Sequence, residues 1–435
     1  MGSYINIGND GFKSALKGDY VDKTGLIAVI NGTLFGEDRF TCVSRCRRFG
    51  KSMAAKMLCA YYDRSCDSRE LFRGLEIEKH PDFEEYLNRY PVIFVDMTDF
   101  MTKYRKDMAI VDHIKDALLA DLHSHYPDIL LNERDDVMDL LVKVTERYGD
   151  KFIIIVDEWD AICREFAVGT GVMDEYVDFL RRLFKGEKSM RVFAGAYLTG
   201  ILPVKKYKTE SALNNFREYS MVRPKGLAGY LGFTKSEVEV LCEKYAMDYE
   251  DVAKWYDGYS LGKEPSIFNP NSVMEAFASH ECDSYWSATG AFDAVARYIS
   301  MDFEGLKGDI INMLAGGSCL VDTTGFKNDP TIIKTKDDVF TLLIHLGYLA
   351  YNSKEKRCYV PNMEVAGEMK NAIVDNGWTL VTNAIGDSER LLDHLLAGET
   401  DAVAAGIGKV HEESASVLKH NDENSLSFVI NLAFY

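Results

Sequence analysis

The segment that ends in Gly50, Lys51 and Ser52 constrains the fold of this chain more than any other feature. An apolar run at residues 40–43 leads into a short loop that ends in these three residues, and an apolar helical face begins directly after them. A strand, a glycine-containing loop and Lys-Ser at a helix start form a P-loop pattern. Glycine lets the backbone approach phosphate oxygens, and the N–H groups of the helix start point at the anion. The pattern predicts a phosphate-binding turn, in which Lys51 bridges the β- and γ-phosphates and the Ser52 hydroxyl binds Mg²⁺.

The loop departs from the general pattern GxxxxGK[ST] at its first position, where Arg45 stands in place of glycine. Arg47 and Arg48 follow it, and the planar guanidinium groups of these three arginines suit phosphate oxygens, which partly offsets the loss. Taken alone, the segment leaves a second interpretation open, namely a basic turn in which Gly-Lys-Ser occurs by chance.

Two acidic residues, Asp157 and Glu158, follow a second apolar run at residues 152–156, in the form of a Walker B motif. At the carboxyl end of a strand, Asp157 is expected to hold Mg²⁺ through water and Glu158 to accept the proton of an attacking water. The alternative is that both acids simply end a buried strand, but the P-loop upstream, in the expected order, favours the catalytic interpretation. Asp160 is expected either to bind metal or to cap the next helix, and the cap is slightly favoured.

Thr199 ends a third apolar run, at residues 192–198, and is followed by Gly200. In P-loop ATPases with a catalytic glutamate, a polar residue at the end of the strand beside Walker B senses the γ-phosphate or orients water. An ordinary Thr-Gly turn explains the same pattern equally well. For Arg217 and Arg223, which come next, a solvated or ion-paired arginine is favoured over an arginine finger reaching a neighbouring subunit.

Short apolar runs alternate with amphipathic helical patterns between residues 39 and 223, which predicts an α/β fold with a doubly wound parallel sheet. Beyond Pro224 the runs typical of strands become rare, and helical periodicity predicts a mostly helical region with a winged-helix-like hint at residues 339–361. We therefore expect domains at residues 1–225, 226–368 and 369–435. The expected strands are residues 40–43, 92–95, 152–156, 192–198 and, weakly, 219–222, and the expected apolar helix faces are Met53, Met57, Leu58 and Tyr61; Ile110, Ile114, Ala117 and Leu118; Val137, Leu140, Leu141 and Val144; and Met173, Tyr176, Val177, Leu180, Leu183 and Phe184.

Composition excludes several classes of protein. No apolar run approaches the ~20 residues of a membrane span, and no basic and apolar leader opens the chain, so a cytoplasmic protein without a membrane partner is expected. The nine cysteines form no CxxC pair, which argues against a disulfide framework or a zinc site. A formal charge of −18 argues against a chain that coats nucleic acid along most of its surface.

Together with the P-loop and Walker B patterns, several other segments along the chain resemble, in sequence and in order, the bacterial AAA-ATPase-like proteins that commonly carry a PD-(D/E)XK nuclease-like domain at their C-terminus. Cys46 departs from that family, which usually has proline there. The resemblance implies an ATPase core of the additional-strand, catalytic-glutamate type, a helical middle region and the start of a nuclease-like domain, in which Glu423 resembles the glutamate of the first helix. Because the strands that would carry the nuclease chemistry are absent before Tyr435, we expect an incomplete nuclease that does not cut DNA. The matching segments are residues 20–24, 45–52, 156–160, 198–200, 213–215, 255–259, 268–272 and 360–365.

The leading functional hypothesis is a Mg²⁺-dependent ATP-binding protein, a slow ATPase that acts as a regulatory switch for an attached nuclease. The choice of ATP over GTP rests on the resemblance. Two alternatives remain: a nucleotide-gated scaffold without turnover, and a DNA-associated protein of a mobile element or defence system. A homo-oligomer, and nucleic acid bound through the missing nuclease part, are left open. The expected site residues are Glu158 and Thr199 for catalysis, Arg47, Arg48, Phe49, Gly50, Lys51, Ser52 and Met53 for the nucleotide, and Ser52 and Asp157 for the metal.

Overall fold

The structure is a computed structural model that describes residues 2–166, 170–204, 213–286, 303, 305–326, 333–375 and 391–415. The chain divides into two compact units, which we call unit 1 (Met1–Phe233 with Lys327–Ile333) and unit 2 (Thr234–Phe326 with Lys334–Tyr435). The domain limits expected at residues 225 and 368 stay predictions. Glu423 and the rest of residues 416–435 lie outside the described part of the chain.

A five-stranded parallel sheet forms the centre of unit 1, in the order β2-β3-β4-β1-β5. The predicted parallel α/β fold is confirmed for this unit. The last strand lies earlier than the run expected at residues 219–222, because a turn follows it. In this turn the Ser220 N–H donates to the Arg223 carbonyl oxygen, and the Arg223 N–H donates to the Ser220 hydroxyl oxygen. The strands are β1 (Phe40–Ser44), β2 (Val92–Asp96), β3 (Phe152–Asp157), β4 (Phe193–Gly200) and β5 (Arg217–Tyr219).

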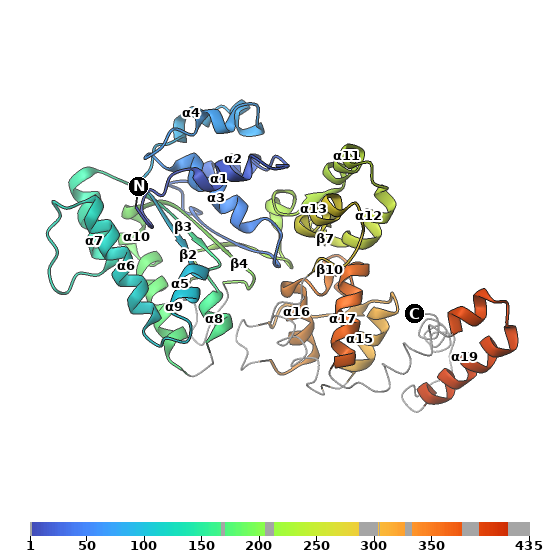
Figure 1. Ribbon diagram of the computed structural model, residues 1–435. Helices are drawn as coiled ribbons and strands as arrows, with labels where there is room; N and C mark the ends of the chain where they lie inside the picture. Colours follow the sequence, from blue (N-terminus) through green and yellow to red (C-terminus); the bar gives the residue numbers. More distant parts are fainter. Residues whose placement is uncertain are drawn as a thin grey trace. The chain divides into compact units, whose positions relative to one another are not determined.

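Each central strand is apolar on both faces, because helices cover the sheet from both sides. Along β3, Ile154 and Val156 enter one core, and Ile153 and Ile155 enter the other, as the two-residue period of a strand requires. In Figure 1 the two groups of helices lie on opposite sides of β2, β3 and β4. One group is α1 (Asp10–Ala15), α2 (Gly25–Asn31), α3 (Lys51–Tyr62), η1 (Arg69–Phe72), η2 (Glu76–Lys79), α4 (Phe83–Tyr86) and η3 (Lys225–Tyr230); the other is α5 (Met97–Lys103), α6 (Ile110–His125), α7 (Val137–Tyr148), α8 (Ala161–Glu165), α9 (Val172–Phe184) and α10 (Glu187–Val192).

The predicted apolar faces of α7 and α9 are confirmed, since every residue expected there is buried. The prediction for α3 is wrong at Met53, which is 38% exposed, whereas Met57, Leu58 and Tyr61 are buried. Met53 lies in the first turn of α3 on the same side as the exposed Lys56, whereas Ala54 and Ala55 occupy the buried side.

Unit 2 combines helices with two small three-stranded sheets, β6-β8-β7 and β10-β11-β9. The described part of this region is rich in helices, as expected, but the two small sheets go beyond the expectation, because strands of two to five residues are too short for their alternation to stand out in the sequence. The hairpin expected near residues 354–361 is confirmed, with β10 and β11 antiparallel. The elements are β6 (Phe233–Thr234), at the division between the units, and α11 (Lys235–Tyr245), α12 (Tyr249–Tyr256), β7 (Tyr259–Leu261), β8 (Glu264–Phe268), α13 (Pro270–Ser279), α15 (Leu306–Leu314), β9 (Cys319–Leu320), α16 (Lys336–Leu346), β10 (Ala350–Asn352), β11 (Arg357–Tyr359), α17 (Met363–Asp375) and α19 (Thr400–Ala415).

None of the helices within the described ranges is both long and apolar enough to cross a membrane.

Candidate active site

The loop between β1 and α3 contains two residues in the left-handed backbone conformation, Arg48 (φ 68°) and Gly50 (φ 80°). A Cβ atom at Gly50 would meet nothing within 4 Å, so its conformation rather than its surroundings favours glycine there. The hydrogen bonds that hold the loop include those from Arg45 N to Gly200 O at 3.0 Å and from Gly232 N to Phe49 O at 3.2 Å. Strained backbone of this kind gathers at ligand-binding turns.

The first position of the loop, Arg45, does not require glycine. Its φ is not positive, so the position makes no demand for glycine. The side chain is fully buried, and its Nη1 donates to the carbonyl oxygens of Ser44 at 3.0 Å and Tyr219 at 3.3 Å. The guanidinium therefore lies beneath the loop and ties β1 to β5.

Lys51 is the first residue of α3, and its side chain is almost entirely buried. Its ammonium group donates to the Cys46 carbonyl oxygen at 3.1 Å and lies 3.4 Å from Oε1 of Glu158. The predicted phosphate-binding lysine thus faces the predicted general base directly.

Asp157, the last residue of β3, brings together the two hydroxyls expected beside it. Thr199 Oγ1 donates a hydrogen bond to Asp157 Oδ1, and the Ser52 side chain is also hydrogen-bonded to this carboxylate. Burial raises the pKa of Asp157 although these two bonds lower it, and the charge of Asp96, at the end of the neighbouring β2, raises it further. A cation bound beside this buried carboxylate would stabilise its ionised form.

Glu158 stands directly after β3 in the left-handed conformation (φ 51°). Its carboxylate lies between two cations, with Lys51 at Oε1 and Arg164 Nη2 at Oε2. Burial alone would raise the pKa of Glu158, but the charges of Lys51 and Arg164 outweigh burial and lower it. Glu158 N lies within hydrogen-bond reach of Asp157 Oδ1 at 3.1 Å and of Thr199 Oγ1 at 3.3 Å.

Asp160 occupies the N-cap position of α8, as slightly favoured, but its side chain makes no capping hydrogen bond. Its buried carboxylate accepts hydrogen bonds from the N–H groups of Ile201 at 3.2 Å and Leu202 at 2.8 Å, and it lies 3.2 Å from Nε of Arg164. These contacts hold the chain after β4 and leave Asp160 facing the protein. Gly200 is required nearby, because a Cβ there would lie 2.7 Å from Asp160 Oδ1.

Arg164 is the site residue that the sequence interpretation missed. It bridges Asp160 and Glu158 from α8. The only signal in the sequence is its spacing of four residues from Asp160, which places the two side chains on one helical face. That spacing occurs in many helices and would not have singled out Arg164.

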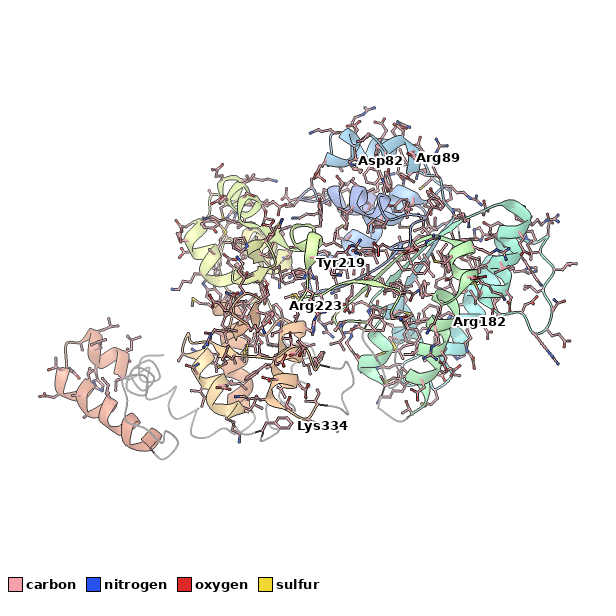
Figure 2. All side chains as sticks on the ribbon, turned by 180° about the vertical axis from the view of Figure 1, so that it is seen from behind. Asp82, Arg89, Arg182, Tyr219, Arg223 and Lys334 are labelled. Atoms are coloured by element: carbon pink, nitrogen blue, oxygen red, sulfur yellow. The ribbon has the colours of Figure 1, made fainter. Side chains whose placement is uncertain are left out.

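The remaining predicted site residues surround this centre at different depths. Phe49 is fully buried, Arg47 is half-buried and close enough to help lower the pKa of Glu158, and Arg48 is exposed. Arg217 pairs with Asp38 of the same chain at 2.9 Å, as the favoured interpretation of this residue predicts. Arg223, labelled in Figure 2, is exposed in the turn after β5.

The donor set fits a magnesium ion held jointly with phosphate. Ser52 and Asp157 supply hard oxygen atoms, and Mg²⁺ is usually bound by one or two such side chains together with substrate phosphates. Within the part of the chain that the structure describes, no group of three or more His, Cys, Asp or Glu side chains is arranged to hold a metal by itself.

Comparison with known proteins agrees with this geometry. No curated protein matches the chain. Residues 6–209, which include β1 to β4, the loop and the residues predicted for catalysis, nucleotide and metal, match the model of the AAA-ATPase-like family, described as "Predicted AAA-ATPase", and this match implies nucleotide binding.

Proposed function

We propose that unit 1 binds Mg²⁺-ATP and hydrolyses it slowly. One observation carries the proposal: Lys51, Ser52, Asp157, Glu158 and Thr199 converge at the carboxyl ends of β1, β3 and β4, linked by the contacts described above. Ligands of open parallel sheets bind at this edge.

The phosphate groups are expected to bind at the start of α3. Lys51 leaves Glu158 and the Cys46 carbonyl to meet the β- and γ-phosphates, and the N–H groups of the loop and first helical turn donate to phosphate oxygens. Arg47 and Arg48 add positive charge at the mouth of the loop. Phe49 anchors the loop in the core, Gly50 provides its left-handed turn, and Met53 lies at its exposed edge.

Ser52 and Asp157 would hold Mg²⁺, and the bound ion would neutralise the negative charge that develops on the phosphate groups. Thr199 orients the Asp157 carboxylate through its hydrogen bond and is close enough to sense what binds there. Because β4 lies between β1 and β3, the order of strands supports assignment to the additional-strand, catalytic-glutamate type.

Glu158 would act as the general base. When Lys51 moves to phosphate, Oε1 of Glu158 is released, whereas Oε2 stays bound to Arg164. A lowered pKa keeps the carboxylate ionised and able to accept a proton from water.

Two measurements on the full chain test this function. We expect calorimetric titration to show Mg²⁺-dependent ATP binding and a phosphate-release assay to show slow turnover. Lys51→Ala removes binding and therefore turnover, whereas Glu158→Gln retains binding and loses turnover at least about a hundredfold, the usual contribution of a general base. Wild-type protein that binds no ATP would refute the proposal.

A second candidate is a nucleotide-gated protein without turnover. It is favoured by one observation, that both carboxylate oxygens of Glu158 are engaged by cations. This candidate predicts ATP binding without phosphate release, and no effect of Glu158→Gln.

The wider role we propose, a cytoplasmic switch for an attached nuclease-like domain, is supported only by the family resemblance. The winged-helix-like hint adds a weak case for DNA, since the turn between β10 and β11 exposes Lys354 and Lys356. A salt-dependent shift of DNA mobility by the full chain would support contact with DNA, and the absence of a shift at low ionic strength would exclude it.

A further inference from the structure

Arg45 is a fully buried cation that the proposed function does not use. Its side chain is 0% exposed, and among the described residues Nη1 alone has hydrogen-bond partners, the carbonyl oxygens of Ser44 and Tyr219. Its Nε and Nη2 atoms are buried without a partner among the described residues. Two of the three guanidinium nitrogens are therefore left unsatisfied.

No carboxylate within the described ranges pairs with this guanidinium. The ionisable groups close enough to influence the pKa of Arg45 are the Cys46 thiol and the Tyr197 hydroxyl, and both are neutral at ordinary pH. Burial, the largest cause, lowers the pKa of Arg45 to about 10, so the group still carries its charge near neutral pH. The Tyr197 hydroxyl is likewise buried without a hydrogen-bond partner.

The position of Arg45 places this charge beside the phosphate-binding turn. Burial raises the pKa of the Cys46 thiol, and the positive charges of both Lys51 and Arg45 oppose that effect, so Cys46 lies within electrostatic reach of both. Tyr197 in turn lies within reach of both Arg45 and Asp157. The guanidinium thus belongs to the same edge of the sheet as the predicted site.

A buried charge without a counter-charge is costly, and proteins normally pair such a group or neutralise it. A ligand that brings negative charge next to the loop would relieve this cost, and the low dielectric of the surroundings would strengthen the attraction. The phosphate groups of a nucleotide bring that charge.

We propose that Arg45 is a built-in positive charge of the phosphate site, whose counter-charge is the phosphate chain of the bound nucleotide. It acts from beneath the loop through its electric field, without leaving its buried position. This inference rests on the proposed function, because it requires a nucleotide at the loop.

The test compares dissociation constants for Mg²⁺-ATP in the full chain, measured by calorimetry. Arg45→Met removes the charge and keeps most of the volume, and Arg45→Lys keeps the charge with fewer donors. Arg73→Met is the matched control, because Arg73 is an exposed arginine paired with Glu70. We expect affinity to fall about tenfold or more in Arg45→Met, and to stay within about threefold of wild type in Arg45→Lys and Arg73→Met.

Each outcome decides between the ideas. If wild-type protein binds no ATP, the proposed function fails before the comparison begins. If wild type binds and Arg45→Met binds equally well, or if Arg45→Lys loses as much affinity as Arg45→Met, the role of the charge is refuted and Arg45 is only a structural donor. If Arg45→Met does not fold, Arg45→Lys decides alone: retained affinity supports the role of the charge, and a tenfold loss overturns it.

Discussion

Glu158 receives its two cationic partners from distant parts of the chain, Lys51 at the start of α3 and Arg164 on α8. In the proposed function the pairing with Lys51 breaks when Lys51 binds phosphate, whereas the pairing with Arg164 involves protein groups alone. The proposal therefore makes Arg164 a positioning residue, which orients Glu158 and tunes its pKa.

Replacing Arg164 is expected to shift the pH dependence of turnover. Since the charge of Arg164 helps to lower the pKa of Glu158, Arg164→Gln raises that pKa. A group that must be ionised to act as a base then loses its proton only at higher pH, so the acid limb of the kcat profile moves upward, by about one pH unit for loss of one close charge. Arg164→Lys retains the charge and should retain the wild-type profile. An acid limb that Arg164→Gln leaves unmoved would contradict this role.

The contiguous motifs show how much of the site can be predicted from the sequence. Lys51 and Ser52, and likewise Asp157 and Glu158, are neighbours in the chain and occupy the ends of strands or the start of a helix. Their roles follow from local pattern. Arg45 and Arg164 could not be predicted in the same way, because burial and ion pairing depend on which distant elements pack around them.

Among the elements, β4 depends on its last residue, Gly200, to bring Thr199 next to Asp157. Gly200→Ala would place a Cβ 2.6 Å from Trp159 Nε1 and 2.7 Å from Asp160 Oδ1, closer than real Cβ contacts allow. We expect a loss of about 1–3 kcal/mol in the free energy of unfolding, as for other overpacked sites, together with weaker Mg²⁺-ATP binding. Urea unfolding and calorimetry measure the two effects.

Gly226→Ala is the matched control in the same unit, because a Cβ there meets nothing within 4 Å and its φ is not positive. If both variants unfold at the same urea concentration as wild type, the close approach at Gly200 is not a constraint.

Two segments of unit 2, residues 255–259 and 268–272, suggest no mechanism as sequence strings and are explained by packing. In the segment 255–259, Gly258 has a φ of 108°, and a Cβ there would lie 1.9 Å from the Pro361 carbonyl oxygen, in the segment 360–365. Asn362 Nδ2 donates to the Asp257 carbonyl at 2.8 Å. In the segment 268–272, Asn269 accepts from Asn271 N at the start of α13. The contacts of Gly258 and Asn362 join residues about a hundred positions apart, which local pattern does not show, whereas the contact of Asn269 is a local helix cap.

At the scale of the whole molecule, the chain carries a formal charge of −18, and the fold opposes ionisation of the Glu364 carboxyl group. Glu364, in the first turn of α17, is 1% exposed. Burial raises its pKa to about 7, although the Ser272 side chain and the N–H groups of Tyr285 and Trp286 oppose burial; the charge of Glu368 adds to it.

The raised pKa of Glu364 predicts how the stability of unit 2 depends on pH. In the unfolded chain the group ionises near its ordinary value of 4.5, whereas in the folded chain it keeps its proton until about pH 7. The folded state therefore binds more protons in that interval, and stability falls as pH rises from about 4.5 to about 7, by about 3 kcal/mol at most.

Glu364→Gln removes this dependence. We expect the variant to match the wild type near pH 4.5 and to exceed its free energy of unfolding at pH 8, measured with urea on the full chain. Glu355→Gln, at an exposed turn, controls for the loss of one negative charge. A difference between Glu364→Gln and wild type that stays constant from pH 4.5 to 8 would show that folding leaves the pKa of Glu364 near its ordinary value.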